Sequence, residues 1–562
     1  MKLCVMLPAL LALALPACSD EPAAGGDDGS TGDPATSTSG EDPSVASSTS
    51  TGEPELSTDG TSSSSSAVDT SSESTDTTGE EADLLSFDLV VQRDVAGDEQ
   101  LFSYRVSDGV ADGLARLHEQ DAGRDWTSPQ FLSGRRVLME VQDPGGNELR
   151  IAHLDEPSQT VRLDVPTKPT ALESGAIVLT DESVLYGNDG LAHRVWLEDL
   201  NPIDRVPWVS YGGSFAASVD PLGRYIVVQA SGAASTLRVS LDDATATPLA
   251  GSSFVPHLNA DGSAGLRGRD AEDGIRRLEF VPLADAVGTP LDLLPEIQAG
   301  QLPTYAPSAD NVRPHPTAHG IAVTVTAVEG DTTLHYIGVE DGLALPAVLL
   351  DGPEVSGEFH GPFAGSGWSP DGRWLGFEVY TEAGYEVWLA EFGDGHKPEL
   401  TLVAPAGPQW WPSFIWAPDS SALYIGHPWS DSKTPPRTER VMLTGKEPIV
   451  QAIGESRSHP LALSPDGTTL VFMQWEGDDA SENRSLHVID VSGAEPGEPS
   501  LLAVSPPGGS VDDVSFSPDG RVVAYGSDDG VMHLMLASLD EPELPHTEVT
   551  DAIAWWFAPS SN

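Results

Sequence analysis

Two histidines are the first candidates for a metal-binding or catalytic site in this 562-residue sequence. His315-Pro316-Thr317-Ala318-His319 has the i, i+4 spacing of paired metal ligands. That spacing brings two side chains together only on a helix, which Pro314 and Pro316 forbid. We therefore expect a surface loop here and no metal. Two other histidines, His360 and His533, belong to no recognisable pattern.

A catalytic serine nucleophile is the second kind of site that the sequence could contain. No Gly-x-Ser-x-Gly motif occurs in the sequence, and Gly212-Gly213-Ser214-Phe215-Ala216 comes nearest but lacks the last glycine. Serine also recurs in a Ser-Pro-Asp-Gly tetrapeptide, where proline sets φ, aspartate accepts backbone amide protons and glycine takes the left-handed conformation. We expect these turns to be structural: Pro370, Asp371, Gly372, Pro465, Asp466, Gly467, Pro518, Asp519 and Gly520.

Aromatic residues beside polar ones give the best candidate for ligand binding. Such a combination suits peptides or sugars. The candidates come from three separate segments: Gln409, Trp410, Trp411, Arg457, His459, Asp512 and Asp513. The alternative is that the tryptophans pack between neighbouring structural units. Trp368 and Trp416 lie inside strand patterns, and we expect both in the core.

The elements that would position these residues are short strands. Over residues 85–562, apolar runs alternate with clusters of Gly, Asp, Pro and Ser, and no apolar period of helical length is sustained, which predicts an all-β fold. The turn recurs about every fifty residues, as expected for four-stranded blades of a β-propeller. We count seven to ten units. One ring of seven or eight blades, a larger ring and two packed propellers all remain open.

The two ends of this region resemble two parts of one blade. The segment DAIAWWFAPSSN at 551–562 has the pattern of a first strand, and the segment from Phe87 has the pattern of the later strands. We expect them to pair, which would close the ring and remove its exposed edges. By analogy with other propeller blades, we expect residues just before a blade's first strand to face the mouth of the central channel. The candidate binding residues would then lie on one rim.

The pattern of the first 84 residues indicates an export signal followed by a linker. Residues 1–17 have one lysine and an apolar stretch too short to span a bilayer. Leu15-Pro16-Ala17-Cys18 resembles the bacterial lipobox, in which Cys18 would be lipidated. Residues 18–84 are rich in Ser, Thr, Asp and Gly, and we expect a disordered acidic tether. The chain has two cysteines, so the mature domain has no disulfide or zinc–thiolate site.

The charge narrows the range of partners. Lys and Arg number 28 against 87 Asp and Glu, giving a formal charge of −59. A surface this acidic repels nucleic acid, so we expect no such partner. Membrane contact would come through the lipid at Cys18.

The repeated turns resemble those of the TolB-like, WD-repeat-like propeller family. The segments that show this resemblance are Trp368-Ser369-Pro370-Asp371-Gly372, Ala417-Pro418-Asp419, Ser464-Pro465-Asp466-Gly467 and Ser517-Pro518-Asp519-Gly520. The resemblance implies a β-propeller, and TolB itself implies a periplasmic propeller that binds a lipoprotein. This chain lacks the α/β domain that precedes the propeller there.

These observations lead to one expected function and one alternative. We expect a lipid-anchored extracytoplasmic propeller at the outer membrane or periplasmic face of a bacterial envelope. It would bind an envelope protein or peptide, with neither catalysis nor a cofactor. The alternative is a propeller hydrolase or lyase acting on peptide or polysaccharide, which needs carboxylates that converge in the channel.

Overall fold

The computed structural model describes most of residues 86–559, with gaps of which 164–176 and 293–311 are the longest. Cys18, the predicted signal peptide and the predicted tether lie outside the described residues. All the regular elements of the described part are β-strands, which confirms the all-β prediction. No helix in that part is long and apolar enough to cross a membrane.

The strands of the first half are short and follow one another closely. They are β1 (Phe87–Val95), β2 (Asp98–Ser107), β3 (Val110–His118), β4 (Asp125–Trp126), β5 (Gln130–Leu132), β6 (Arg136–Asp143), β7 (Gly146–His153), β8 (Thr160–Leu163), β9 (Ile177–Val178), β10 (Ser183–Asn188), β11 (Leu191–Trp196), β12 (Val206–Ser210), β13 (Phe215–Val219), β14 (Tyr225–Ala230), β15 (Thr236–Ser240), β16 (Ala246–Leu249), β17 (His257–Leu258), β18 (Ala264–Asp270), β19 (Arg276–Pro282) and β20 (Leu291–Asp292).

The second half continues in the same way. Its strands are β21 (Val312–Pro314), β22 (Gly320–Thr326), β23 (Thr332–Glu340), β24 (Leu343–Ala344), β25 (Val348–Leu349), β26 (Gly357–Glu358), β27 (Trp374–Thr381), β28 (Gly384–Glu391), β29 (Glu399–Gly407), β30 (Ser413–Trp416), β31 (Ala422–Gly426), β32 (Thr438–Met442), β33 (Ile449–Ile453), β34 (Ser458–Leu463), β35 (Thr469–Trp475), β36 (Arg484–Asp490), β37 (Ser500–Val504), β38 (Ser510–Phe516), β39 (Val522–Asp528), β40 (Met532–Ser538), β41 (Thr547–Asp551) and β42 (Ala554–Phe557).

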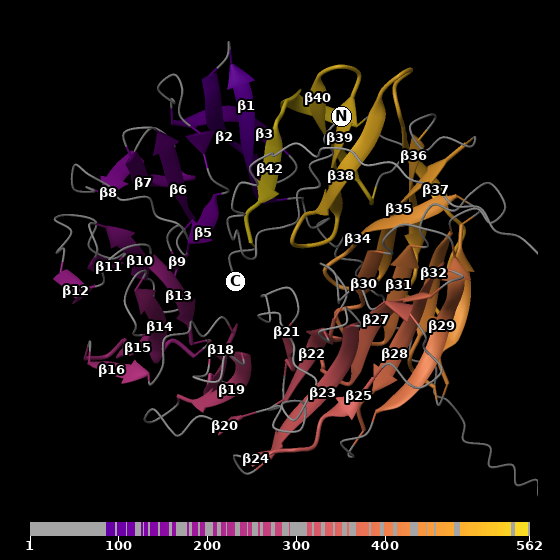
Figure 1. The fold of residues 1–562 in the computed structure, drawn as a ribbon. Helices are drawn as coiled ribbons and strands as arrows, with labels where there is room; N and C mark the ends of the chain where they lie inside the picture. Colours follow the sequence, from indigo (N-terminus) through magenta and orange to yellow (C-terminus); the bar gives the residue numbers. More distant parts are fainter. Residues whose placement is uncertain are drawn as a thin grey trace, which may run out of the picture. The chain divides into compact units, whose positions relative to one another are not determined.

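These strands form the small antiparallel sheets of a β-propeller (Figure 1). Within the described residues, eight sheets have four strands and two have five. In most sheets the strands pair in chain order, as in β30-β31-β32-β33 and β38-β39-β40-β41. Each sheet is therefore one blade built from local hairpins. The number of sheets agrees with the upper end of the predicted range.

One blade combines both ends of the propeller, as the sequence predicted. Its strand order is β3-β2-β1-β42, with Val90 opposite Trp556 and Val91 opposite Trp555. Successive side chains of a strand point to opposite faces. Accordingly, Trp555 packs with the sheet of β38–β41, and Trp556 packs with the sheet of β4–β8. The two adjacent tryptophans thus fill the interfaces on both sides of the closing blade.

Similar apolar clusters join other neighbouring blades. Trp374 and Leu389 pack with Phe414 and Leu423 between the sheets of β26–β29 and β30–β33. A blade is apolar on both faces, so it is stable only when it is stacked between two others. Trp368 and Trp416, which we expected in the core, are partly buried against such clusters.

The Ser-Pro-Asp-Gly turns join the first and second strands of their blades. The Oγ atom of Ser369 donates to Asp371 Oδ1 at 2.6 Å and accepts the Trp374 amide proton at 2.9 Å. The Gly372 amide closes the turn on the Ser369 carbonyl oxygen at 2.9 Å, with φ at 76°. Ser369 is fully buried and its hydroxyl is used within the turn. The turns at Ser464 and Ser517 repeat these bonds.

Each of these turns also packs on the turn of the blade before it. Gly467 lies against Pro418, and Gly520 lies against Pro465. Gly372 lies against His315, whose ring also packs on Trp368 with centroids 4.4 Å apart. His315 is only 7% exposed, so the expectation of a surface loop is wrong at this residue. His319 lies outside the described residues.

Candidate functional site

The first strands of successive blades carry the predicted binding residues. Strands β30, β34 and β38 are each the edge strand of a sheet, and β34 lies beside both of the others. Arg457 immediately precedes β34, His459 is the second residue of β34, and Asp512 and Asp513 lie in β38. We call these four residues the first-strand rim. Arg457 and His459 lie at the end of their blade opposite the Ser-Pro-Asp-Gly turn, and Asp512 and Asp513 lie near the middle of β38.

His459 is a partly buried residue of this rim. It lies opposite Met473 of β35. Burial lowers the pKa of His459 to about 4, so its imidazole is neutral at pH 7. A neutral imidazole offers one hydrogen-bond donor and one acceptor. His459 is therefore suited to hydrogen bonding with an uncharged polar group such as a peptide amide.

Asp512 and Asp513 lie next to each other at a β-bulge. The register of β38 against β39 shifts between Asp512 and Ser515. Asp512 Oδ2 accepts a hydrogen bond from Ser510 Oγ at 3.2 Å and lies 3.8 Å from Arg484 Nη1, which belongs to the preceding blade. Among the described residues, Asp512 Oδ1 is buried and has no hydrogen-bond partner. A buried acceptor in this state favours a ligand that can donate to it.

Burial raises the pKa of both rim carboxyl groups. The hydrogen bond from Ser510 and the charge of Arg484 counteract this effect at Asp512, and the charge of Asp512 reinforces it at Asp513. Two adjacent carboxyls with raised pKa values hold a proton more readily than ordinary surface carboxyls do. The protonated form of a carboxyl, which can donate as well as accept a hydrogen bond, is therefore favoured at both residues.

Backbone conformation also distinguishes the rim. Arg457 has φ at 73° and Asp513 has φ at 50°, which residues other than glycine rarely adopt. Four described non-glycine residues have positive φ, and two of them belong to the rim. Strained backbone of this kind gathers at functional sites, where neighbouring structure holds it in place.

The remaining predicted binding residues cannot be placed. Gln409, Trp410 and Trp411 precede β30 in the sequence but lie outside the described residues. Their membership of the rim stays a prediction. The structure does bring Arg457 and His459 to the start of a strand that neighbours that of Asp512 and Asp513. Their positions before or within first strands were the sequence signal for this.

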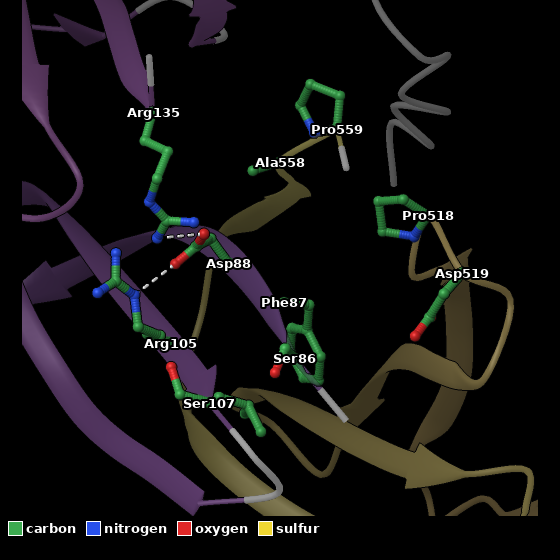
Figure 2. Close-up of a pocket in the computed structure, with 11 residues that line it drawn as sticks. Ser86, Phe87, Asp88, Arg105, Ser107, Arg135, Pro518, Asp519, Ala558 and Pro559 are labelled. Carbon is green, nitrogen blue, oxygen red and sulfur yellow. Dashed lines mark hydrogen bonds and ion pairs between the residues drawn. The ribbon is translucent and has the colours of Figure 1, made fainter. Parts of the chain in front are cut away.

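A pocket at the opposite end of the closing blade was not predicted. Its cavity volume is about 250 Å³, and it lies between the closing blade and the turn at Pro518 and Asp519. Figure 2 shows Arg105 and Arg135 pointing from two sides toward Asp88. Arg105 Nε lies 3.0 Å from Asp88 Oδ1, and Arg135 Nη2 lies 2.5 Å from Asp88 Oδ2.

A second carboxylate completes this charge network. Asp155 pairs with Arg105 and, at 3.1 Å, with Arg135 Nε. Hydrogen bonding to Arg105 chiefly holds the pKa of Asp155 below its usual range. Two arginines thus meet two aspartates, and the set is neutral. Arg105 and Asp88 belong to the closing blade, whereas Arg135 and Asp155 flank strands of the next one. We interpret the network as a link between blades rather than as an anion site.

Comparisons with known proteins leave the family open. No protein-family model matches the sequence, and no curated protein matches it. Similar solved structures include a eukaryotic initiation factor, with 12% identity and a TM-score of 0.42 over 68% of this chain and 90% of that one. Another is the dihydro-heme d1 dehydrogenase NirN, with 14% identity and a TM-score of 0.33 over 68% and 74%.

TolB from Acinetobacter baumannii is also among the similar structures. The match has 12% identity and a TM-score of 0.25, and it covers 75% of this chain and 82% of that one. Scores and identities this low assign neither a family nor an activity. The β-propeller that the sequence resemblance implied is established by the strand pairing itself.

Proposed function

We propose that this chain is a lipid-anchored extracytoplasmic β-propeller that binds an envelope protein or peptide at its first-strand rim and catalyses no reaction. One observation carries the proposal. Neighbouring first strands of adjacent blades carry a neutral histidine and an unsatisfied buried carboxylate oxygen. Such groups suit the amides of an extended peptide.

The membrane part of the proposal depends on the sequence. The lipobox-like segment ending at Cys18 supplies an anchor, and residues 18–84 supply a tether of low apolar content. A tether of this length lets the propeller reach partners away from the membrane surface. A strong negative charge keeps such a domain soluble and favours cationic partners.

A hydrolase or lyase is the second candidate. The observation in its favour is the Asp512–Asp513 pair, because raised pKa values suit a general acid. Hydrolysis of a peptide or polysaccharide by this carboxyl pair would need one protonated and one ionised carboxyl. In a screen of peptide and glycan substrates, an enzyme would show turnover that Asp512→Asn abolishes. A binding protein would show no turnover in the wild type.

Partner capture tests the binding proposal. The full chain serves as bait for detergent-solubilised envelope, beside Asp512→Asn/Asp513→Asn and Trp410→Ala/Trp411→Ala. Leu222→Ala is the control, because Leu222 is 62% exposed in the turn between β13 and β14, at the other end of its blade. We expect one partner with the wild type and the control, and its loss with both rim variants.

Two other outcomes would change the proposal. Equal capture by every bait would keep the function but remove the rim as its site. Capture by none of them would contradict the binding function itself. Fatty-acid labelling of the chain, lost in Cys18→Ser, separately tests the anchor.

A further inference from the structure

A histidine and three carboxylates converge on the outer part of the blade of β38–β41, whose first strand also carries Asp512 and Asp513. His533 lies in β40, Glu548 and Asp551 lie in β41, and Asp529 lies in the turn between β39 and β40. His533 Nδ1 lies 3.2 Å from Glu548 Oε1 and 3.3 Å from Asp551 Oδ1. One ligand atom from each of these three residues lies within 4.8 Å of the other two.

A β-bulge makes this convergence possible. Glu548 and Asp551 are three residues apart, and in a regular strand they would point to opposite faces. The register of β40 against β41 shifts between Leu534 and Met535, so that Asp551 lies opposite His533 and Glu548 lies opposite Met535. The extra residue turns both carboxylates to the face of His533. Bulges commonly re-aim side chains in this way beside functional sites.

The distances fit a tetrahedral metal centre. Zinc binds histidine nitrogen and carboxylate oxygen at about 2.0–2.2 Å, so neighbouring ligand atoms lie roughly 3.3–3.5 Å apart. The two separations from His533 Nδ1 are close to that range. Hydrogen bonding explains the arrangement less well, because Nδ1 carries at most one proton and faces two carboxylates. A cation would satisfy both carboxylates together.

The other nitrogen of the same ring has a matching partner. His533 Nε2 lies 3.4 Å from Asp529 Oδ1. A metal-binding histidine usually offers its second nitrogen to a carboxylate, which fixes the tautomer and the ring orientation. Here the carboxylate lies on the side of the ring away from Glu548 and Asp551. One nitrogen therefore faces the proposed ligands and the other faces an orienting group.

We propose that His533, Glu548 and Asp551 bind a divalent transition-metal ion of the zinc class, and that Asp529 orients the histidine ring. Three protein ligands leave a fourth position of the tetrahedron for water or for a group from a partner. The mixed nitrogen and oxygen set favours zinc over calcium, which takes six to eight oxygen ligands. The ion would tie the outermost strand of this blade to its neighbour. The proposed ligands lie on β40 and β41, whereas Asp512 and Asp513 lie on β38 at the other edge of the same sheet.

Calorimetric titration of the full chain with ZnCl₂ tests the site. We expect the wild type to bind one zinc ion per chain tightly. The affinity for zinc should fall by more than roughly 100-fold in His533→Gln and by about 10- to 100-fold in Asp529→Asn. His153→Gln and Glu498→Gln are matched controls in other blades and should bind as the wild type does. Calcium should bind only weakly. The ligand variant Glu548→Gln and the control variant Glu498→Gln should change calcium binding to the same extent.

The same titration can overturn the site. Absence of a stoichiometric zinc equivalent would contradict it. Retention of that equivalent in His533→Gln would show that the acidic surface binds zinc diffusely. All four residues are near the surface, with side chains of His533, Glu548 and Asp551 exposed by 26%, 59% and 57%, so we expect the variants to fold. Circular dichroism would check this.

Discussion

At the scale of single residues, the contacts of a turn glycine decide what a substitution costs. Gly372 and Gly520 have nearly the same φ, at 76° and 75°. A Cβ atom at Gly372 would lie 2.3 Å from His315 Cε1, whereas at Gly520 the nearest atoms would be 3.6 Å away. The two positions therefore share the backbone strain and differ in the clash.

We predict that Gly372→Ala destabilises the propeller more than Gly520→Ala does. Placing alanine in the left-handed conformation costs about 1–2 kcal/mol at both positions. Displacing the buried His315 ring adds a further cost of about 1–3 kcal/mol at Gly372. Urea unfolding of both variants measures the difference. Equal losses of stability would contradict the packing of one turn on the next.

Glu378 is a second residue whose surroundings predict a measurable effect. It is fully buried in β27, and neither carboxyl oxygen has a hydrogen-bond partner among the described residues. Burial raises the pKa of Glu378 to about 9. The folded state therefore keeps a proton that the unfolded state releases above about pH 4.5. Stability should fall as pH rises from about 4.5 to 9.

We predict that Glu378→Gln removes this pH dependence. Glutamine resembles the protonated acid and cannot ionise. Between pH 4.5 and pH 7 the wild type should lose on the order of 3 kcal/mol relative to the variant. Denaturant unfolding at several pH values provides the comparison. Parallel stability curves for the two proteins would show that Glu378 ionises normally.

At the scale of elements, the closing blade is held by charge as well as by strand pairing. Asp88 of β1 and Asp155 after β7 each pair with both Arg105 and Arg135. The two carboxylates differ in burial, since the Asp88 side chain is 8% exposed and that of Asp155 is 54% exposed. A surface pair contributes little, whereas a desolvated pair is costly to break.

We predict that Asp88→Asn destabilises the fold by about 2–3 kcal/mol and that Asp155→Asn costs less than about 1 kcal/mol. Both changes remove one carboxylate from the same two arginines, so each is a control for the other. Thermal unfolding at low and high salt would measure them. A larger effect for Asp155→Asn would mean that the buried pair does not support ring closure.

Local features of the fold could be predicted from the sequence, whereas contacts between blades could not. The Ser-Pro-Asp-Gly turns depend on neighbouring residues, and the closing blade followed from incomplete patterns at both ends. The burial of His315 depends on Gly372 of the next blade, and the pairing of Arg135 with Asp88 also crosses a blade boundary. The Glu548–Asp551 convergence needs a bulge that strand alternation does not reveal.

At the scale of the whole molecule, the propeller presents two different ends. One end carries the turns, which pack on one another and use their serine and aspartate groups internally. The other carries Arg457 and His459 of the first-strand rim, and the carboxyl groups of the rim lie near the middle of β38. An exposed apolar residue marks each end: Ile553, just before β42, is 45% exposed, and Leu222, in a turn, is 62% exposed. If the partner binds at the first-strand rim, it should contact the end of the propeller where Ile553 lies.

Photo-crosslinking in intact cells would show whether a partner binds at the rim. A photoreactive amino acid replaces Ile553 in one variant and Leu222 in another, and each full chain is irradiated in the envelope. Binding at the rim predicts a specific protein adduct from position 553, lost when Asp512→Asn/Asp513→Asn is added, and none from position 222. An adduct from position 222 alone, or none from either position, would contradict binding at the rim.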